Sequence, residues 1–132
     1  MKEILDEESR NVLVQYRMEQ ALSALSDADL LLQNMRLNAA ANRLYYACFY
    51  ATEALLIKNA IPTTTHAGMR NMFSLKFVQT GLIEPKWGRF LTQIEQMRKG
   101  ADYDFFIKYE ESELQEILPL VQEYIQVLRR LI

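Results

Sequence analysis

The chain has 132 residues, of which 50% are hydrophobic and 24% are charged, and this balance predicts one globular domain over residues 1–132 with a packed core. No apolar run reaches the ~20 residues that a membrane span requires, and we expect no secretory leader in the acidic segment 1–8. The single cysteine, Cys48, excludes an internal disulfide, and with one histidine we expect no metal or other cofactor. These features predict a cytoplasmic protein.

The net charge of −2 argues against a general nucleic-acid binder, but the charges are spread unevenly. Residues 66–100 carry six basic and two acidic side chains, a balance of +4, whereas residues 1–65 and 101–132 sum to −2 and −4. A basic middle segment of this kind is suited to a phosphate backbone. The equally weighted alternative is a solvated helix face with scattered lysines and arginines.

Helical periodicity begins near the N-terminus and predicts a first helix over residues 7–33. Its apolar residues recur at three- and four-residue steps: Leu13, Tyr16, Ala21, Leu25, Ala28 and Leu32. Asn38 is expected to be a turn or cap residue before a second helix over residues 39–59, because Asn is a favoured N-cap residue. That helix should end before Pro62, since a proline disfavours helical geometry in the residue that precedes it.

Turn residues divide the second half of the chain into further helices. Thr65 is the expected N-cap of a third helix over residues 66–80, which Gly81 should terminate. Pro85 suits the first turn of a fourth helix over residues 86–99.

Gly100 should end that fourth helix. A fifth helix is predicted over residues 110–131, and Pro119 inside it should kink it or split off its first turns. Short connections between helices favour antiparallel neighbours, so the predicted fold class is all-α, an up-and-down bundle of four to five helices.

The second helix carries a cationic and aromatic stripe. Positions seven apart differ by only ~20° around a helix, which places Arg43 and Tyr50 on one stripe with Tyr46 between them. An arginine on such a stripe suits phosphate binding, and the alternative is an Arg43–acid pair among structural tyrosines. The opposite side is apolar and is expected to be buried: Leu44, Cys48, Ala51 and Leu55.

Residues 42–51 (NRLYYACFYA) resemble the second-helix signature of small prokaryotic HEPN-domain proteins, in which an arginine and two tyrosines precede an aromatic- and alanine-rich helix. Three later segments are similar to the family and lie in the expected order: residues 65–68 (THAG), 78–83 (VQTGLI) and 98–103 (RKGADY). Together they cover nearly the whole chain. Each segment is weak alone, but four in order are specific to the family.

The resemblance implies a helical bundle that dimerises through the helices carrying the arginine motif. Catalytic members are metal-independent ribonucleases, and their motif is an arginine followed after four to six residues by a histidine. The arginine suits the scissile phosphate because of its donor fork, and the histidine moves a proton near neutral pH. The resemblance also implies a partner, often a small nucleotidyltransferase that acts as the antitoxin.

The chain departs from this motif at the proton-transfer position. Six residues separate Arg43 from Tyr50, which stands where the histidine is expected. A tyrosine with an ordinary pKa near ~10 is a poor base at neutral pH, although it remains a hydrogen-bond donor. His66 is the one substitute in the sequence, with a structural role at a helix N-terminus as its alternative. The departure favours loss of ribonuclease activity.

A second set of residues follows the fourth predicted helix. Arg98 and Asp102 are four apart, so they are expected to form either an ion pair that fixes the next loop or, with Tyr103, a contact for phosphate or base. Trp87 and residues 104–107 are interpreted as core or dimer-contact residues.

The predicted catalytic residues are thus Arg43 and Tyr50. The predicted RNA- or nucleotide-binding residues are Asn42, Tyr46, His66, Arg98, Asp102 and Tyr103. The leading hypothesis is a dimeric subunit of a HEPN/nucleotidyltransferase toxin–antitoxin-like system that binds nucleic acid or nucleotide with degenerate catalysis. The alternatives are an active metal-independent endoribonuclease that uses Arg43 and a binder of small phosphate compounds.

Overall fold

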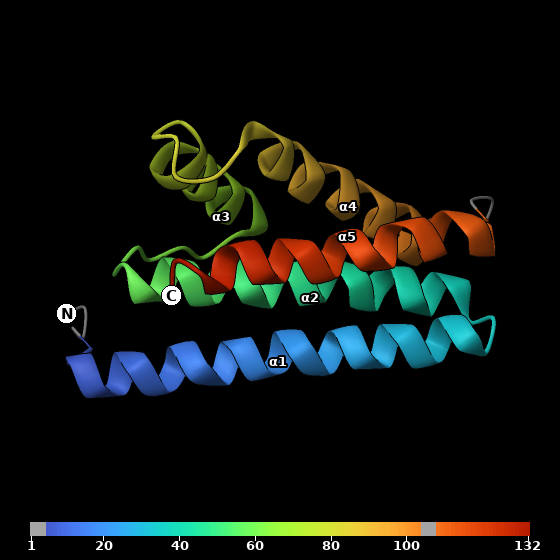
Figure 1. Ribbon diagram of the computed structural model, residues 1–132, viewed down its shortest axis with the longest axis horizontal. Coiled ribbons are helices and arrows are strands. Elements are labelled where there is room, and N and C mark those ends of the chain that lie inside the picture. The colour runs from blue at the N-terminus through green and yellow to red at the C-terminus, as the bar shows by residue number, and fades with distance from the viewer. Residues whose placement is uncertain (1–4, 104–107) are drawn as a thin grey trace.

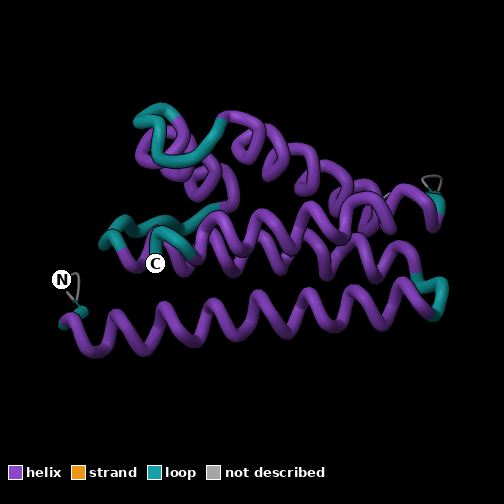
Figure 2. Tube along the Cα trace, in the orientation of Figure 1, coloured by secondary structure: helices purple, strands orange, loops and turns teal. Residues whose placement is uncertain are grey.

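The computed structural model describes residues 5–103 and 108–132. Its elements are α1 (Glu7–Gln33), α2 (Leu37–Lys58), α3 (His66–Phe73), the π-helix η1 (Ser74–Val78), α4 (Pro85–Tyr103) and α5 (Glu111–Arg129). Figure 2 shows helices and loops, and no strand, over these described residues, which confirms the predicted all-α bundle. Within the same ranges, no helix has both the length and the apolar character needed to cross a membrane.

The central element of the bundle is α2, which packs against each of the other α-helices. In Figure 1, α1 lies along one side of α2, while α3 and α4 lie on the other side. Its buried face includes five alanines, Ala40, Ala41, Ala47, Ala51 and Ala54. These small side chains let the neighbouring helices approach closely, and the predicted burial of Leu44, Cys48, Ala51 and Leu55 is confirmed.

The predicted bounds of α1 are confirmed, and the helix begins after Asp6, whose carboxylate accepts a hydrogen bond from the Ser9 amide at 2.7 Å. The buried stripe is Val14, Met18, Ala21, Ala24, Ala28 and Leu32. Tyr16 was predicted in this stripe but is 53% exposed. The prediction was wrong there because Val14 and Met18 occupy the face that turns toward α2.

The predicted capping role of Asn38 is also wrong. The chain reverses after α1 through Met35, which has a φ of 58°, and the Arg36 amide donates to the Leu31 carbonyl at 2.9 Å. Because of this turn, α2 begins at Leu37, and Asn38 lies in its first helical turn. Its side-chain amide instead donates to the Ala101 carbonyl of α4 at 3.3 Å, and it therefore ties the start of α2 to the end of α4.

The cap predicted for the third helix is confirmed, since the Thr65 hydroxyl accepts a hydrogen bond from the Gly68 amide at 2.9 Å. The segment predicted as one helix over residues 66–80 divides into α3 and the π-helix η1. It stops before Gly81, whose φ of 83° is a left-handed conformation that favours glycine.

The predicted ends of the last two helices need correction. Gly100 does not stop α4, which runs to Tyr103, because the Arg98–Asp102 pair, four residues apart, spans Gly100 and stabilises the final turn. Pro119 does not split α5, which is continuous from Glu111 to Arg129, and the proline ring lies on the exposed side of the helix. The expected burial of Trp87 is confirmed, whereas residues 104–107 lie outside the described residues.

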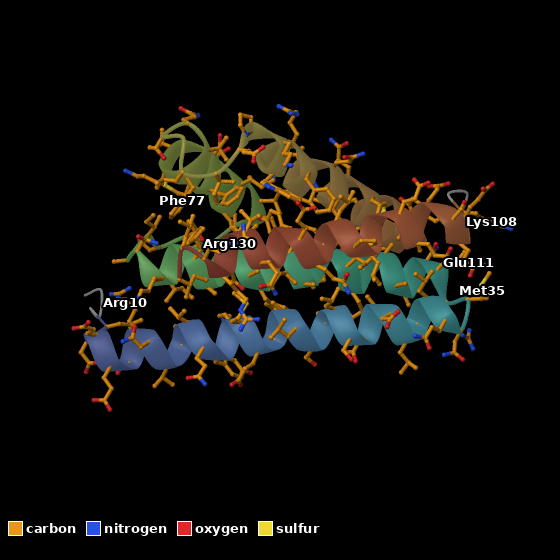
Figure 3. All side chains as sticks on the ribbon, in the orientation of Figure 1. Arg10, Met35, Phe77, Lys108, Glu111 and Arg130 are labelled. Carbon is orange, nitrogen blue, oxygen red and sulfur yellow. The ribbon has the colours of Figure 1, made fainter. Side chains whose placement is uncertain are left out.

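The connections gather at opposite ends of the bundle. Figure 3 shows Met35 of the α1–α2 turn, Lys108 and Glu111 at one end, and Arg10 at the other. The C-terminal end of α4 lies at the same end as Met35 and Glu111 (Figure 1). The start of α2 and the end of α4 therefore meet there, as the Asn38–Ala101 hydrogen bond requires.

Candidate functional site

Arg43 lies half-buried on α2 with its guanidinium held by neighbours on its own helix. Its Nε and Nη2 atoms donate to the Asn42 Oδ1 atom at 3.0 and 2.8 Å, and the guanidinium carbon lies 5.2 Å from the centre of the Tyr46 ring. Over residues 5–103 and 108–132, no carboxylate forms an ion pair with Arg43. Glu53, further along the same helix, pairs with Arg17 of α1 at 3.7 Å. The described carboxylates therefore do not form the Arg43–acid pair that was the alternative prediction.

Asn42 connects Arg43 to the end of α4. Its Nδ2 atom donates to both carboxylate oxygens of Asp102, at 3.0 and 3.3 Å. A carboxylate only accepts hydrogen bonds, so this contact turns the amide nitrogen toward Asp102 and leaves the amide oxygen for Arg43. The same carboxylate lies 3.6 Å from the Nη1 atom of Arg98. One continuous chain of polar contacts thus joins the two arginines.

Arg98 is a buried cation enclosed by tyrosine rings. Only 7% of the residue is exposed. Its guanidinium carbon lies 5.0 Å from the Tyr45 ring, 5.7 Å from Tyr46 and 5.7 Å from Tyr103. Its Nη1 atom also donates to the Tyr103 hydroxyl at 3.3 Å, while the buried Nε atom has no hydrogen-bond acceptor among the described residues. Cation–π contacts stabilise the charge, but the guanidinium keeps more donors than acceptors.

Several of the predicted site residues contact the Tyr46 ring. Both Arg43 and Arg98 lie over it, and the His66 ring meets it edge-on at 6.3 Å. Among the described residues, Tyr50 joins the cluster through ring contacts, at 5.9 Å from Tyr46 and 5.7 Å from Phe49. The structure therefore brings all the predicted residues together, with Tyr50 at the edge of the cluster. We call this set the Arg43–Arg98 cluster: Asn42, Arg43, Tyr46, Tyr50, His66, Arg98, Asp102 and Tyr103.

His66 enters the cluster from the first turn of α3. Its Nδ1 atom shares a short hydrogen bond with the Tyr45 hydroxyl, and its ring stacks on Phe49 at 4.6 Å. Burial of the imidazole lowers the pKa of His66, and the positive charge of Arg98 lowers it further. Burial and the nearby Glu95 carboxylate raise the pKa of the Tyr45 hydroxyl well above its usual range. Both groups are consequently neutral at pH 7.

Sequence reasoning missed three residues that support the cluster. The sequence pattern identifies Tyr45 and Phe49 only as part of an aromatic helix, whereas in the structure they contact His66. Glu95 is 3% exposed and pairs with Arg70 of α3 and, at 3.6 Å, with Lys99. No spacing in the sequence relates α2 to α3, so the Tyr45–His66 contact could not be found from periodicity. The available sequence signal for Glu95 was its own position, because it is a charged residue on the apolar face of α4.

The lowered pKa of His66 predicts a pH dependence of stability. Below an ordinary histidine pKa of about 6.5, the unfolded chain binds a proton that folded His66 still resists. The free energy of unfolding is therefore complete above pH 6.5 and falls as the pH drops toward the lower pKa of the folded state. We expect His66→Gln to flatten this part of the profile, measured by urea unfolding between pH 5 and 8. Parallel profiles for the two proteins would contradict the assignment.

The donor set of the cluster suits phosphate rather than a metal ion. Arginine, tyrosine and asparagine provide hydrogen-bond donors, and arginine forks match phosphate oxygens. In the part of the chain that the structure describes, no three or more His, Cys, Asp or Glu side chains gather in a metal-binding arrangement. Cys48 is buried, and burial raises the pKa of its thiol well above the usual range, so it is a core side chain rather than a nucleophile.

Comparisons with known proteins identify the family of the chain. The model of the HEPN domain matches residues 14–131. A UPF0332 protein of Thermotoga maritima is 32% identical over 120 residues, which cover 91% of each chain. A Methanocaldococcus jannaschii protein named "Putative toxin" is 38% identical over 103 residues, 78% of this chain and 76% of that protein. A second protein of the same organism and name is 28% identical over 101 residues, 76% and 69% of the two chains. With nearly its whole length matched to the HEPN domain, the chain belongs to the HEPN family.

Proposed function

We propose that this chain is the toxin-type subunit of a toxin–antitoxin-like pair and that the Arg43–Arg98 cluster binds phosphate groups of RNA or of a nucleotide. The observation that carries the proposal is the pair of arginines joined through Asn42 and Asp102, one of which has no carboxylate partner in the described ranges. The names of the two Methanocaldococcus jannaschii relatives support the toxin-type role.

The cluster offers two kinds of contact to a nucleic acid. Arg43 keeps donors beyond those bound to Asn42, and a guanidinium fork binds phosphate with two parallel hydrogen bonds. Tyr103 is 73% exposed beside Arg98, so its ring is available for stacking against a base. Phosphate and base contacts together favour a single-stranded or looped RNA over a regular duplex.

A homodimer and an antitoxin partner are part of this proposal. Support comes from the resemblance and from the exposed apolar side chains of α1, Val12 at 64% and Tyr16 at 53%. The partner would be a small nucleotidyltransferase. Light scattering on the purified chain should give twice the 15.5 kDa chain mass. A monomer at high concentration would count against the dimer.

We propose binding without efficient cleavage, because Tyr50 stands where the family motif places its histidine. A second candidate, active cleavage, is favoured by His66, whose neutral imidazole meets the Tyr46 ring. In that case His66 would take the proton of a 2′-hydroxyl as its oxygen attacks the adjacent phosphorus. The 5′-oxygen would leave with a proton from water, and a 2′,3′-cyclic phosphate would remain.

A binding and cleavage assay on mixed RNA without added metal tests both candidates. We expect wild type to bind without cleaving and Arg43→Ala to bind at least about tenfold more weakly, since a charge-assisted contact contributes roughly 1.5–3 kcal/mol. Tyr50→His should gain cleavage if the rest of the Arg43–Arg98 cluster is able to hold RNA. Lys58→Ala, at the exposed end of α2, is the control.

Two results would change the conclusion. Cleavage by wild type that disappears in both Arg43→Ala and His66→Gln would establish the second candidate. Unchanged RNA affinity in Arg43→Ala would contradict phosphate binding by the cluster.

A further inference from the structure

We propose that single-stranded RNA held by the Arg43–Arg98 cluster continues along the outward face of α4 into a second binding site between α3, η1 and α4. This inference rests on the proposed function and extends it with a path for the strand. The second site, which we call the α3–α4 groove, has a volume of about 550 Å³. Its lining includes Arg70, Asn71, Arg89, Thr92, Gln93 and Gln96.

The groove is lined by hydrogen-bond donors and positive charge. Two arginines and several amide and hydroxyl groups line it, and none of its lining residues is acidic. It lies within residues 66–100, where six basic and two acidic side chains give a balance of +4 in a chain of net charge −2. A polyanion is the ligand that such a surface attracts.

Arg70 is fixed at the wall of the groove by a buried carboxylate. Its guanidinium pairs with Glu95, whose side chain is only 4% exposed, and Lys99 lies 3.6 Å from the same carboxylate. One negative charge thus faces two positive ones, and Arg89 adds an exposed third. The groove keeps a net positive charge after its internal ion pairs are formed.

The α3–α4 groove and the Arg43–Arg98 cluster are linked by one exposed stripe of α4. Arg89, Gln96 and Tyr103 follow one another at seven-residue steps, so they lie within ~40° of each other around the helix and span about 21 Å. All three are exposed. Arg89 and Gln96 line the groove, while Tyr103 covers Arg98 in the cluster. Figure 1 shows α4 running from α3 toward the start of α5, which is the direction of the proposed path.

A close approach of two elements shapes the floor of the groove. Gly88 of α4 faces Val78 of η1, and a Cβ atom at position 88 would lie 3.4 Å from the Val78 Cγ2 atom. The missing side chain lets α4 pack against η1 and leaves the polar residues of both walls facing the groove. Arginines combined with an exposed aromatic ring suit single-stranded nucleic acid, with phosphates on arginine and bases on tyrosine.

Anisotropy titrations with labelled single-stranded RNAs of twelve and of three nucleotides test the path. Arg89→Gln should weaken binding of the long RNA about fivefold and reduce its salt slope by about 0.7, the value for one phosphate contact on a single strand. Gln96→Glu should weaken binding of the long RNA more than Arg89→Gln does, because it adds a negative charge to the groove. Neither change should affect the short RNA, which fits the cluster alone. Arg130→Gln, at the end of α5 outside the groove, is the matched control, and thermal melting checks the fold of each variant.

The outcomes separate the path from the proposed function. If Arg89→Gln and Gln96→Glu bind the long RNA like wild type while Arg43→Ala binds it weakly, the groove assignment is wrong and the proposed function stands. An equal loss in Arg130→Gln would mean general charge attraction and would also overturn the path. If wild type binds neither RNA, both the path and the proposed function fail.

Discussion

Replacing Arg98 by methionine should weaken RNA binding about 30-fold, because a buried guanidinium in contact with phosphate contributes roughly 2 kcal/mol. The same change should shift the melting temperature only slightly, because loss of the Arg98–Asp102 contact is offset by removal of a buried charge. Arg98 is 7% exposed, its nearest carboxylate oxygen on Asp102 is 3.6 Å away, and its Nε atom has no acceptor in the described residues. Methionine fills a similar volume among the tyrosine rings without a buried charge. Fluorescence anisotropy and thermal melting measure the two effects.

Arg98→Lys is the informative comparison for this prediction. Lysine keeps the positive charge but loses the planar fork and most of the stacking on Tyr45 and Tyr46. We expect it to bind RNA at an intermediate affinity. A strong loss of stability in Arg98→Met with RNA affinity unchanged would identify Arg98 as a structural residue.

Replacing Arg70 by methionine should lower the free energy of unfolding by about 3 kcal/mol, the cost of leaving a buried carboxylate without its main partner. The Glu95 side chain is 4% exposed, and its remaining partner, Lys99, lies 3.6 Å away with a side chain that is 56% exposed. That lysine holds the charge in place only weakly because water competes with the carboxylate. Urea unfolding at pH 7 measures the change.

The double variant Arg70→Met/Glu95→Leu separates the ion pair from the packing around it. Removing both charges and filling the space with apolar groups should recover most of the lost stability. A double variant as unstable as Arg70→Met alone would show that the Arg70 side chain contributes through its contacts with α3 and α4 rather than through Glu95.

The sequence alone determined the helical class of the protein and most of its helix starts and stops. The periodicity of α1, the Thr65 cap and the Gly81 stop are local features, and each depends on residues within a few positions of one another. The aromatic and alanine pattern of residues 42–51 likewise predicted the family, which the match over residues 14–131 confirms. Local sequence suffices there because caps, turns and amphipathic faces form from neighbours in the chain.

The tertiary structure decided the remaining helix bounds. Gly100 stays helical because Arg98 and Asp102 pair across it, and Asn38 lies inside α2 because the preceding turn ends early and its side chain reaches Ala101. These contacts outweigh the local preference of glycine and asparagine for helix ends, since a propensity of about 1 kcal/mol or less is easily exceeded by packing.

The arrangement of the candidate site was likewise a product of tertiary packing. Sequence reasoning could name Arg43 and Arg98, but their connection through Asn42 and Asp102 joins positions 60 residues apart. His66 meets Tyr45 from a different helix, and Arg98 is buried by rings from α2 as well as α4. Burial, hydrogen-bond partners and shifted pKa values depend on which helix faces touch, and that is set only when the whole bundle packs around α2.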